Sequence, residues 1–148
     1  MKKRILWTCI TVFWGLFIFS QSLNTGETSG AMSGSITAFL LQFLPIGEEL
    51  LHTLIRKGAH FAEYFVLGTL LVNTFRTYGL FPRKWDFTAP LFGCFWAVLD
   101  ESIQTLVPDR AGMVADVLLD SAGVFCGTMV VLAVIYCKKK KENTVCSV

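Results

Sequence analysis

Ionisable residues recur at helical spacing in the apolar stretch "IRKGAHFAEYFVLG". Arg56, His60 and Glu63 follow one another at steps of four and three, so they share one face of a predicted helix, which Lys57 and Tyr64 border. Imidazole and carboxylate groups on one face can transfer protons, pair with bases or bind a cation. In lipid such groups normally face protein, a water-filled cavity or a ligand.

A second set of polar residues lies in "LDESIQTLVPDR". Asp100 and Gln104 are four residues apart and therefore lie on one helical face, which Glu101 adjoins. The turn that follows this helix contains Arg110.

A third set follows the same rule. Asp116 and Asp120 are four residues apart, and Gly123 and Gly127 continue their stripe with a spacing that lets two helices approach closely. This segment is therefore predicted to pack tightly against another helix.

We expect the three polar faces to meet in one cluster. The acids outnumber the bases even if His60 is protonated, which predicts protonated carboxyl groups, a bound cation, or a ligand with positive or hydrogen-donating groups. His60 and Glu63 resemble metal-ligand spacing only weakly, so we predict neither a metal nor a cofactor. The predicted ligand-binding residues are Arg56, Lys57, His60, Glu63, Tyr64, Asp100, Glu101, Gln104, Arg110, Asp116 and Asp120.

The composition requires helices that cross a membrane. Of the 148 residues, 53% are hydrophobic, and the mean hydropathy of +0.56 is far above that of soluble proteins. A spanning helix needs about 20 largely apolar residues. We predict an all-α membrane protein with one domain, residues 1–148: a four-transmembrane-helix bundle with spans at about 4–21, 57–76, 86–107 and 113–137.

The first outer loop, 22–56, is predicted to contain short helices. Residues 22–35 are rich in Ser, Gly and Thr and indicate irregular structure. Apolar stripes predict short helices at Ile36–Leu44 and Glu48–Ile55, separated by "PIG" and lying on the outer membrane surface. His52 is predicted to be a surface residue rather than a ligand.

The basic residues predict the orientation. They gather at 2–4, 76–84 and 138–141, which four spans place on one side, so both termini are expected to be cytoplasmic. This rim suits anionic lipid headgroups and gives no reason to expect nucleic acid as a partner. The alternative is a signal peptide cleaved at "SQS", which would leave three spans and an outer N-terminus.

Three stretches, "FSQSLNTGETSG", "IRKGAHFAEYFVLGTLL" and "LDESIQTLVPDRAGMVADVLLDSAGVFCG", resemble the VanZ-like family of bacterial membrane proteins over residues 20–127. The resemblance implies a small four-span protein of the bacterial cytoplasmic membrane that keeps its first span. The family's name-giving member is associated with resistance to the glycopeptide teicoplanin. Asp109 and Met113 depart from the family pattern, which leaves the shape of their turn open. The family's characteristic polar residues fall on Ser20, Gln21, Arg56, Lys57, His60, Glu63, Tyr64, Asp100, Glu101, Gln104, Arg110 and Asp116.

The leading functional hypothesis is an envelope protein that binds or moves a lipid headgroup or a lipid-linked cell-wall precursor at the outer-facing cluster. Arg56, Lys57 and Arg110 would contact phosphate or carboxylate groups. Such binding would lower susceptibility to teicoplanin-type lipoglycopeptides. The expected partners are membrane lipids; the oligomeric state stays open.

Two alternatives remain. An intramembrane enzyme acting on a lipid headgroup or envelope precursor would use His60 as general base, Glu63 to orient it, and Asp100 or Glu101 as acid or metal ligand. The sequence offers no persuasive nucleophile, so we lean toward a protein that is not an enzyme. The third hypothesis is a structural or partner-binding membrane protein.

Overall fold

The computed structural model describes residues 1–23, 26–80, 87–107 and 112–145. No strand occurs in these residues, and the predicted all-helical fold is confirmed. The five helices are α1 (Lys2–Ser22), α2 (Gly26–Leu40), α3 (Glu48–Thr77), α4 (Thr88–Gln104) and α5 (Val114–Val145).

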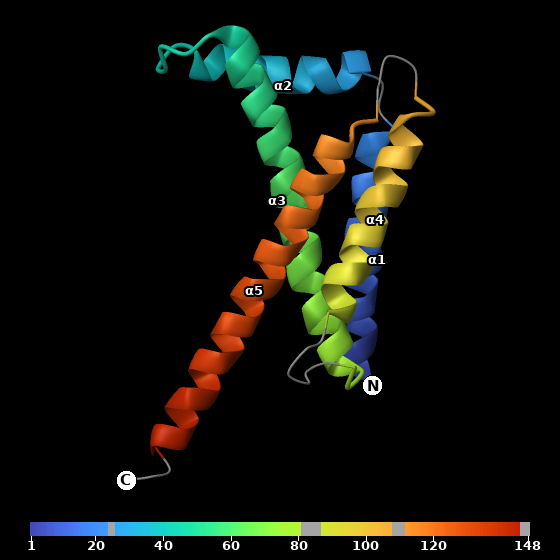
Figure 1. The fold of residues 1–148 in the computed structure, drawn as a ribbon, viewed down its shortest axis with the longest axis vertical. Coiled ribbons are helices and arrows are strands. Elements are labelled where there is room, and N and C mark those ends of the chain that lie inside the picture. The colour runs from blue at the N-terminus through green and yellow to red at the C-terminus, as the bar shows by residue number, and fades with distance from the viewer. Residues whose placement is uncertain (24–25, 81–86, 108–111, 146–148) are drawn as a thin grey trace.

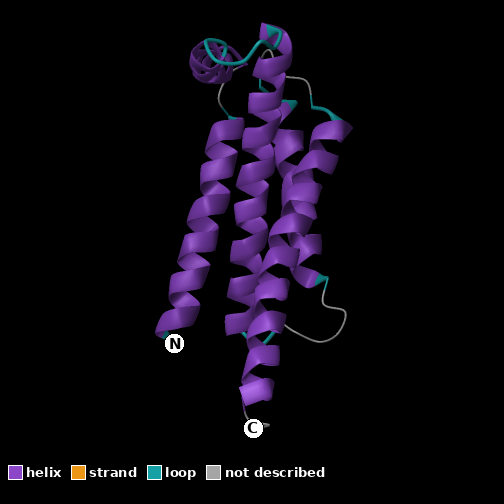
Figure 2. Cartoon of the chain, turned by 90° about the vertical axis from the view of Figure 1, so that its left-hand side faces the viewer, coloured by secondary structure: helices purple, strands orange, loops and turns teal. Residues whose placement is uncertain are grey.

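Four of these helices form an elongated bundle, and α2 lies across one end of it (Figures 1 and 2). Both chain termini lie at the opposite end (Figure 1). α1 and α4 therefore run toward α2, whereas α3 and α5 run away from it. The long helices α3 and α5 run in the same direction and cross, and their contact is the most extensive in the molecule.

Helix α2 replaces the predicted loop at 22–35, and that prediction is wrong from Gly26 onward. Gly, Ser and Thr are weak helix formers, but contacts with other elements can outweigh propensity. Ser33 and Thr37 are buried, and Ser33 Oγ lies 2.7 Å from His52 Nε2 on α3. His52 is half-buried in this contact and is not the surface residue that the sequence predicted.

Helix α3 is one continuous helix of 30 residues, so the short helix predicted at Glu48–Ile55 is only its beginning. Its start is defined by the extended backbone of Gly47, and Glu48 and Glu49 in the first turn complement the positive end of the helix dipole. The chain leaves α3 through Gly79, whose φ of 73° is the left-handed conformation common after helix ends.

Glycine allows the close crossing of α3 and α5, as the sequence predicted. A Cβ added to Gly123 would lie 2.6 Å from the carbonyl oxygen of Phe61, and one added to Gly127 would collide with the carbonyl oxygen of Phe65. Gly68 plays the same part on α3, because a Cβ there would collide with the backbone of Val124. The backbones of the two helices therefore touch directly.

Two of the described helices, α1 and α5, are long and apolar enough to cross a membrane, judged by length and composition. Large apolar side chains such as Phe13, Leu91 and Met129 are exposed on the outside of the bundle, whereas Asp100 and Asp120 are fully buried. This distribution is consistent with a membrane protein. The predicted spans at 57–76 and 86–107 stay predictions.

Candidate functional site: a buried polar cluster

Polar side chains from α3, α4 and α5 meet in the half of the bundle nearer α2. The last turns of α4 and the first turns of α5 lie in this half (Figure 1). We name the following residues the polar cluster: Lys57, His60, Tyr64, Asp100, Glu101, Gln104, Asp116 and Asp120.

Two contacts connect α3 with α5 in the cluster. Lys57 Nζ lies 3.2 Å from Asp116 Oδ1, and one turn further His60 Nδ1 lies 3.9 Å from Asp120 Oδ1. Exposure falls steeply along this row: the Lys57 side chain is 39% exposed, and the side chain of Asp120 is 0% exposed. The predicted helical faces thus do meet, and the cluster extends from the surface into the core.

A second chain of contacts reaches from α4 to α1. Gln104 Nε2 donates a hydrogen bond to Asp100 Oδ2 at 3.3 Å and lies 3.4 Å from the hydroxyl oxygen of Ser22. All three side chains are buried. Ser22 was not predicted as a site residue: "SQS" was considered as a cleavage signal, and the family resemblance singled out Ser20 and Gln21 but not Ser22. In the structure these residues form the last turn of α1. Ser20 is exposed, and its hydroxyl donates to the Phe17 carbonyl of its own helix.

Glu101 has a different task from the other acids. Its Oε1 accepts a hydrogen bond of 2.6 Å from the backbone N–H of Met113, immediately before α5 begins. Backbone N–H groups at a helix start have no partner within the helix, and a carboxylate is the strongest acceptor for them. Glu101 therefore ties the end of α4 to the start of α5, and the unusual side chain of Met113 does not affect this bond.

The deepest part of the cluster contains polar atoms without hydrogen-bond partners among the described residues. Neither carboxylate oxygen of Asp120 has a hydrogen-bond partner among the described residues, and the same holds for Asp100 Oδ1 and the Tyr64 hydroxyl. His60, Asp100 and Asp120 each offer one atom that lies within 4.8 Å of the other two. The sequence singled out Glu63 as the neighbour of His60, but the structure places the carboxylate of Asp120 there.

Three further predicted residues have no side-chain contact described above. Arg56 is exposed. Glu63 is half-buried beside the cluster: its carboxylate is close enough to Asp100 and Asp120 to interact with both electrostatically, and its backbone oxygen accepts a 2.9 Å hydrogen bond from Trp14 Nε1. Arg110 lies outside the described residues. A nucleophile is not evident either: the hydroxyl of Ser102 is exposed and donates to the Val98 carbonyl of its own helix.

The comparisons with known proteins agree with the resemblance. The family model for VanZ/LLP1 matches residues 6–136, which is most of the chain. No curated protein and no solved structure matches it. The match includes most of α1, the crossing of α3 and α5, and every residue of the polar cluster. The chain therefore belongs to the VanZ/LLP1 family.

Proposed function

We propose that this protein is a four-span protein of the bacterial cytoplasmic membrane that binds or moves a lipid headgroup or a lipid-linked cell-wall precursor. Binding at the polar cluster would lower susceptibility to teicoplanin-type lipoglycopeptides. The observation that carries the proposal is a buried, acid-rich cluster in the half of the bundle away from both termini.

The charge distribution supports an outward-facing cluster. Lys2, Lys3 and Arg4 begin the chain, and Lys138–Lys141 lie near its end, so these basic residues share the end of the bundle opposite α2 (Figure 1). Arg76 lies in the last turn of α3, which ends there too. Since Lys and Arg are retained on the cytoplasmic side, this end is expected inside and the polar cluster in the outer half of the membrane.

The edge of the cluster suits an anionic group. Lys57 is partly exposed and is held by Asp116, and Arg56 is exposed one residue earlier. Ammonium and guanidinium groups bind phosphate and carboxylate oxygens by charge-assisted hydrogen bonds. Arg110, which the family resemblance singles out, completes the proposed basic set.

The interior of the cluster suits hydrogen-bond donors. A carboxylate accepts hydrogen bonds at both oxygens, and Asp100 and Asp120 offer such oxygens below the basic edge. A headgroup with an anionic part and hydroxyl or amine groups would match both regions. A phospholipid or a lipid-linked wall precursor has this chemistry.

The test is drug susceptibility in a sensitive Gram-positive host that expresses the protein. We would compare the wild type with Glu63→Gln, Lys57→Gln and Arg110→Ala, and use Glu49→Gln, an exposed acid at the start of α3, as the matched control. The amount of each protein in the membrane is measured in parallel. We expect the wild type and the control to protect against teicoplanin more than against vancomycin, and the three variants to protect less.

Two results would contradict the proposal in different ways. Full protection by variants present at normal levels would mean that the cluster only holds the helices together. No protection by the wild type would mean that the resistance phenotype does not extend to this chain.

A further inference from the structure

We propose that His60, Asp100 and Asp120 form a binding site for a divalent transition-metal ion such as Mn²⁺ or Zn²⁺. The three residues come from α3, α4 and α5, and one ligand atom from each lies within 4.8 Å of the others. The sequence carried only a weak metal signal, at His60 and Glu63 with nearby carboxylates, and the prediction of no metal rested on that weakness; the structure adds Asp120 as a buried neighbour of His60.

Asp120 gives the main reason to expect a ligand. Its side chain is 0% exposed, and neither of its oxygens has a hydrogen-bond partner among the described residues. His60 Nδ1, at 3.9 Å, is too far away for a hydrogen bond. A buried carboxylate normally has a partner or coordinates a metal ion, and Asp120 points at the two other potential ligands.

Asp100 is oriented in the way that metal ligands usually are. Gln104 donates to its Oδ2, and Gln104 is itself next to Ser22 of α1. Asp100 Oδ1 has no hydrogen-bond partner among the described residues, and it is the oxygen left over for a cation. Outer hydrogen bonds of this kind fix the orientation of ligating carboxylates.

The spacing fits a small ion after a modest contraction. Metal–ligand bonds of about 2.1 Å in a tetrahedral site place neighbouring ligand atoms about 3.4 Å apart. Side-chain rotations that shift each ligand atom by a few tenths of an ångström to about one ångström would bring the three atoms to this spacing. One nitrogen and two carboxylate oxygens suit Mn²⁺ and Zn²⁺ better than Ca²⁺, which binds oxygen alone.

The charge of the site and the access to it also favour a bound cation. Lys57 pairs with Asp116 at the edge of the cluster, so it does not neutralise Asp100 and Asp120, and a metal ion would supply the positive charge beside them. Among the three ligands only His60 is partly exposed, at 22% of its side chain, and an ion would enter past it. The site lies within the polar cluster but does not depend on any lipid being bound there.

The first experiment measures metal content. Full-length protein is purified in detergent without chelators, and bound metals are quantified by mass spectrometry for the wild type, Asp120→Asn and His60→Gln. His52→Gln is the matched control, because His52 is the other histidine of the chain, lies on the same helix, and bonds Ser33 outside the cluster. We expect about one Mn²⁺ or Zn²⁺ per chain in the wild type and the control, and a loss of most of it in the two ligand variants.

The second measurement covers variants that fold poorly or lose metal during purification. Protein stripped with a chelator is titrated with Mn²⁺, Zn²⁺ or Mg²⁺ alone, and its thermal midpoint is followed. Binding to the folded state must raise the midpoint of the wild type and the control, and it must leave Asp120→Asn and Asp100→Asn unchanged.

Absence of bound metal together with absence of a metal-dependent shift in the wild type would overturn the site. Equal shifts in the wild type and Asp120→Asn would overturn it too, because the ion would bind elsewhere. Neither measurement depends on drug resistance, so the failure of one proposal is distinguishable from the failure of the other.

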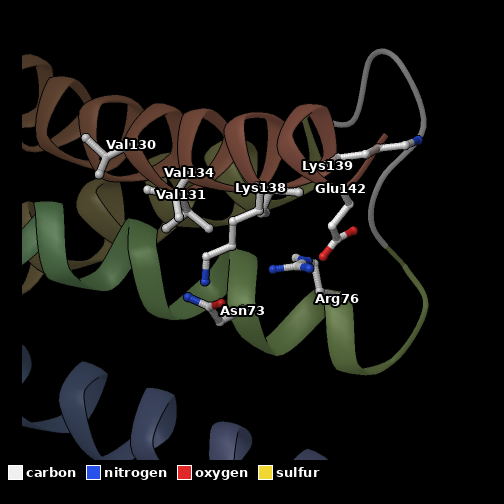
Figure 3. Close-up of a pocket in the computed structure, with 9 residues that line it drawn as sticks. Asn73, Arg76, Val130, Val131, Val134, Lys138, Lys139 and Glu142 are labelled. Atoms are coloured by element: carbon white, nitrogen blue, oxygen red, sulfur yellow. The ribbon is translucent and has the colours of Figure 1, made fainter. Parts of the chain in front are cut away.

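A different observation, at the other end of the bundle, carries a second inference. We infer that a recess of about 620 Å³ between α3 and α5 binds an anionic phospholipid. Its lining is part apolar and part basic: Val130, Val131 and Val134 form an apolar wall on α5, and Arg76 and Lys138 supply cationic groups, whereas Lys139 extends away from Arg76 (Figure 3). Figure 3 shows Lys138 extending from α5 toward Asn73 of α3.

Apolar and cationic groups that line one recess match the two parts of a lipid. An acyl chain would lie against the valines, and a negatively charged headgroup would contact Arg76 and Lys138, where Glu142 offsets only part of the positive charge. Clusters of Lys and Arg beside a membrane helix attract anionic lipids. The recess is at the end of the bundle that holds both termini, and so it is distinct from the polar cluster.

The test compares two double variants that remove the same charge from the same end of the molecule. Arg76→Gln/Lys138→Gln alters the recess, and Lys2→Gln/Lys3→Gln is the matched control. Delipidated protein receives phosphatidylglycerol or phosphatidylcholine, and the thermal midpoint is recorded. We expect phosphatidylglycerol to raise the midpoint of the wild type and the control more than phosphatidylcholine does, with this difference lost in the recess variant.

An equal loss in both variants would show that surface charge in general attracts the lipid. No preference in the wild type would also overturn the site.

Discussion

At the scale of single residues, the polar cluster contains side chains with separate tasks. Glu101 accepts a hydrogen bond from the backbone at the start of α5, whereas Asp120 has no such donor among the described residues. Lys57 and Asp116 pair at the edge. The same residue type thus serves architecture at one position and offers a ligand atom at another, and the difference lies in the partners.

Glu101 provides the residue-scale prediction. Glu101→Ala removes the acceptor of the Met113 N–H and should lower the free energy of unfolding by about 0.5–1.5 kcal/mol, the usual net contribution of one hydrogen bond. Glu101→Gln keeps a carbonyl acceptor and should lose clearly less. Unfolding in detergent micelles, followed by circular dichroism, measures both. Equal losses in the two variants would mean that the negative charge matters and not the hydrogen bond.

At the scale of elements, two kinds of contact hold the bundle together. α3 and α5 pack backbone against backbone at glycines, and α1 is attached to α3 by polar contacts. Arg4 Nε donates to the Thr77 carbonyl at 2.7 Å, and the hydroxyls of Thr11 and Thr74 lie 2.7 Å apart. Apolar packing drives association weakly between helices in lipid, so close approach and hydrogen bonds must supply specificity.

The crossing of α3 and α5 can be tested by adding one methyl group. Gly127→Ala should lower the free energy of unfolding by about 1–3 kcal/mol, because the new Cβ would collide with the Phe65 carbonyl and force the helices apart. Gly58→Ala on α3 is the control, since nothing lies within 4 Å of its added Cβ. It should raise stability by about 0.5–1 kcal/mol through helix propensity. Thermal unfolding of both variants decides, and equal effects would contradict the close crossing.

The attachment of α1 can be tested at Trp14. Trp14→Phe keeps an aromatic ring but removes the N–H that bonds the Glu63 carbonyl, and should lower the free energy of unfolding by about 0.5–1.5 kcal/mol. Trp7→Phe is the matched control on the same helix, because Trp7 contributes its backbone carbonyl, not its indole, to a hydrogen bond: the carbonyl accepts from the Thr74 hydroxyl. Chemical denaturation in micelles compares the two. A smaller loss in Trp14→Phe than in Trp7→Phe would show that the indole N–H contributes nothing.

At the scale of the whole molecule, the arrangement of the helices supports the orientation inferred from charge. Both termini lie at one end, and α2 lies across the other (Figure 1). With four spans, α2 and the edge of the polar cluster would face the outside, and the basic recess would face the cytoplasm. The two proposed sites would then serve opposite leaflets.

Labelling from one side of the membrane tests this orientation. The native cysteines are replaced by serine, and a single cysteine is introduced as Gln42→Cys, after α2, or as Lys3→Cys, at the other end. In intact cells an impermeant maleimide should label Gln42→Cys strongly, and should label Lys3→Cys only after the cells are opened. Labelling of both positions in intact cells would exclude two cytoplasmic termini.

Much of the fold was predictable because periodicity and hydropathy are local properties of the chain. The positions of α1, α4 and α5 and the helical nature of the whole followed from apolar runs, and the glycine spacing of α5 indicated a close helix contact. The shared faces of Asp100 and Gln104 and of Asp116 and Asp120 followed from helical spacing alone. Lys57 was predicted only to border the face of Arg56, His60 and Glu63, but in the structure it contacts α5 together with His60. The first part of helix α2, residues 26–35, was missed because its Ser- and Gly-rich sequence has weak helix propensity, and contacts such as Ser33 with His52 come from elsewhere in the chain.

The sequence by itself determined that the chain is helical, that it belongs with membrane proteins in composition, and which residue types could do chemistry. Only the tertiary structure decided that His60 comes together with Asp100 and Asp120 from two other helices, that Ser22 contacts Gln104 next to Asp100, and that Glu101 accepts a hydrogen bond from the Met113 backbone. The physical reason is that spacing fixes the face on which a side chain lies, whereas its partners depend on the rotation and crossing of neighbouring helices. In this protein the glycine contact between α3 and α5 sets that crossing.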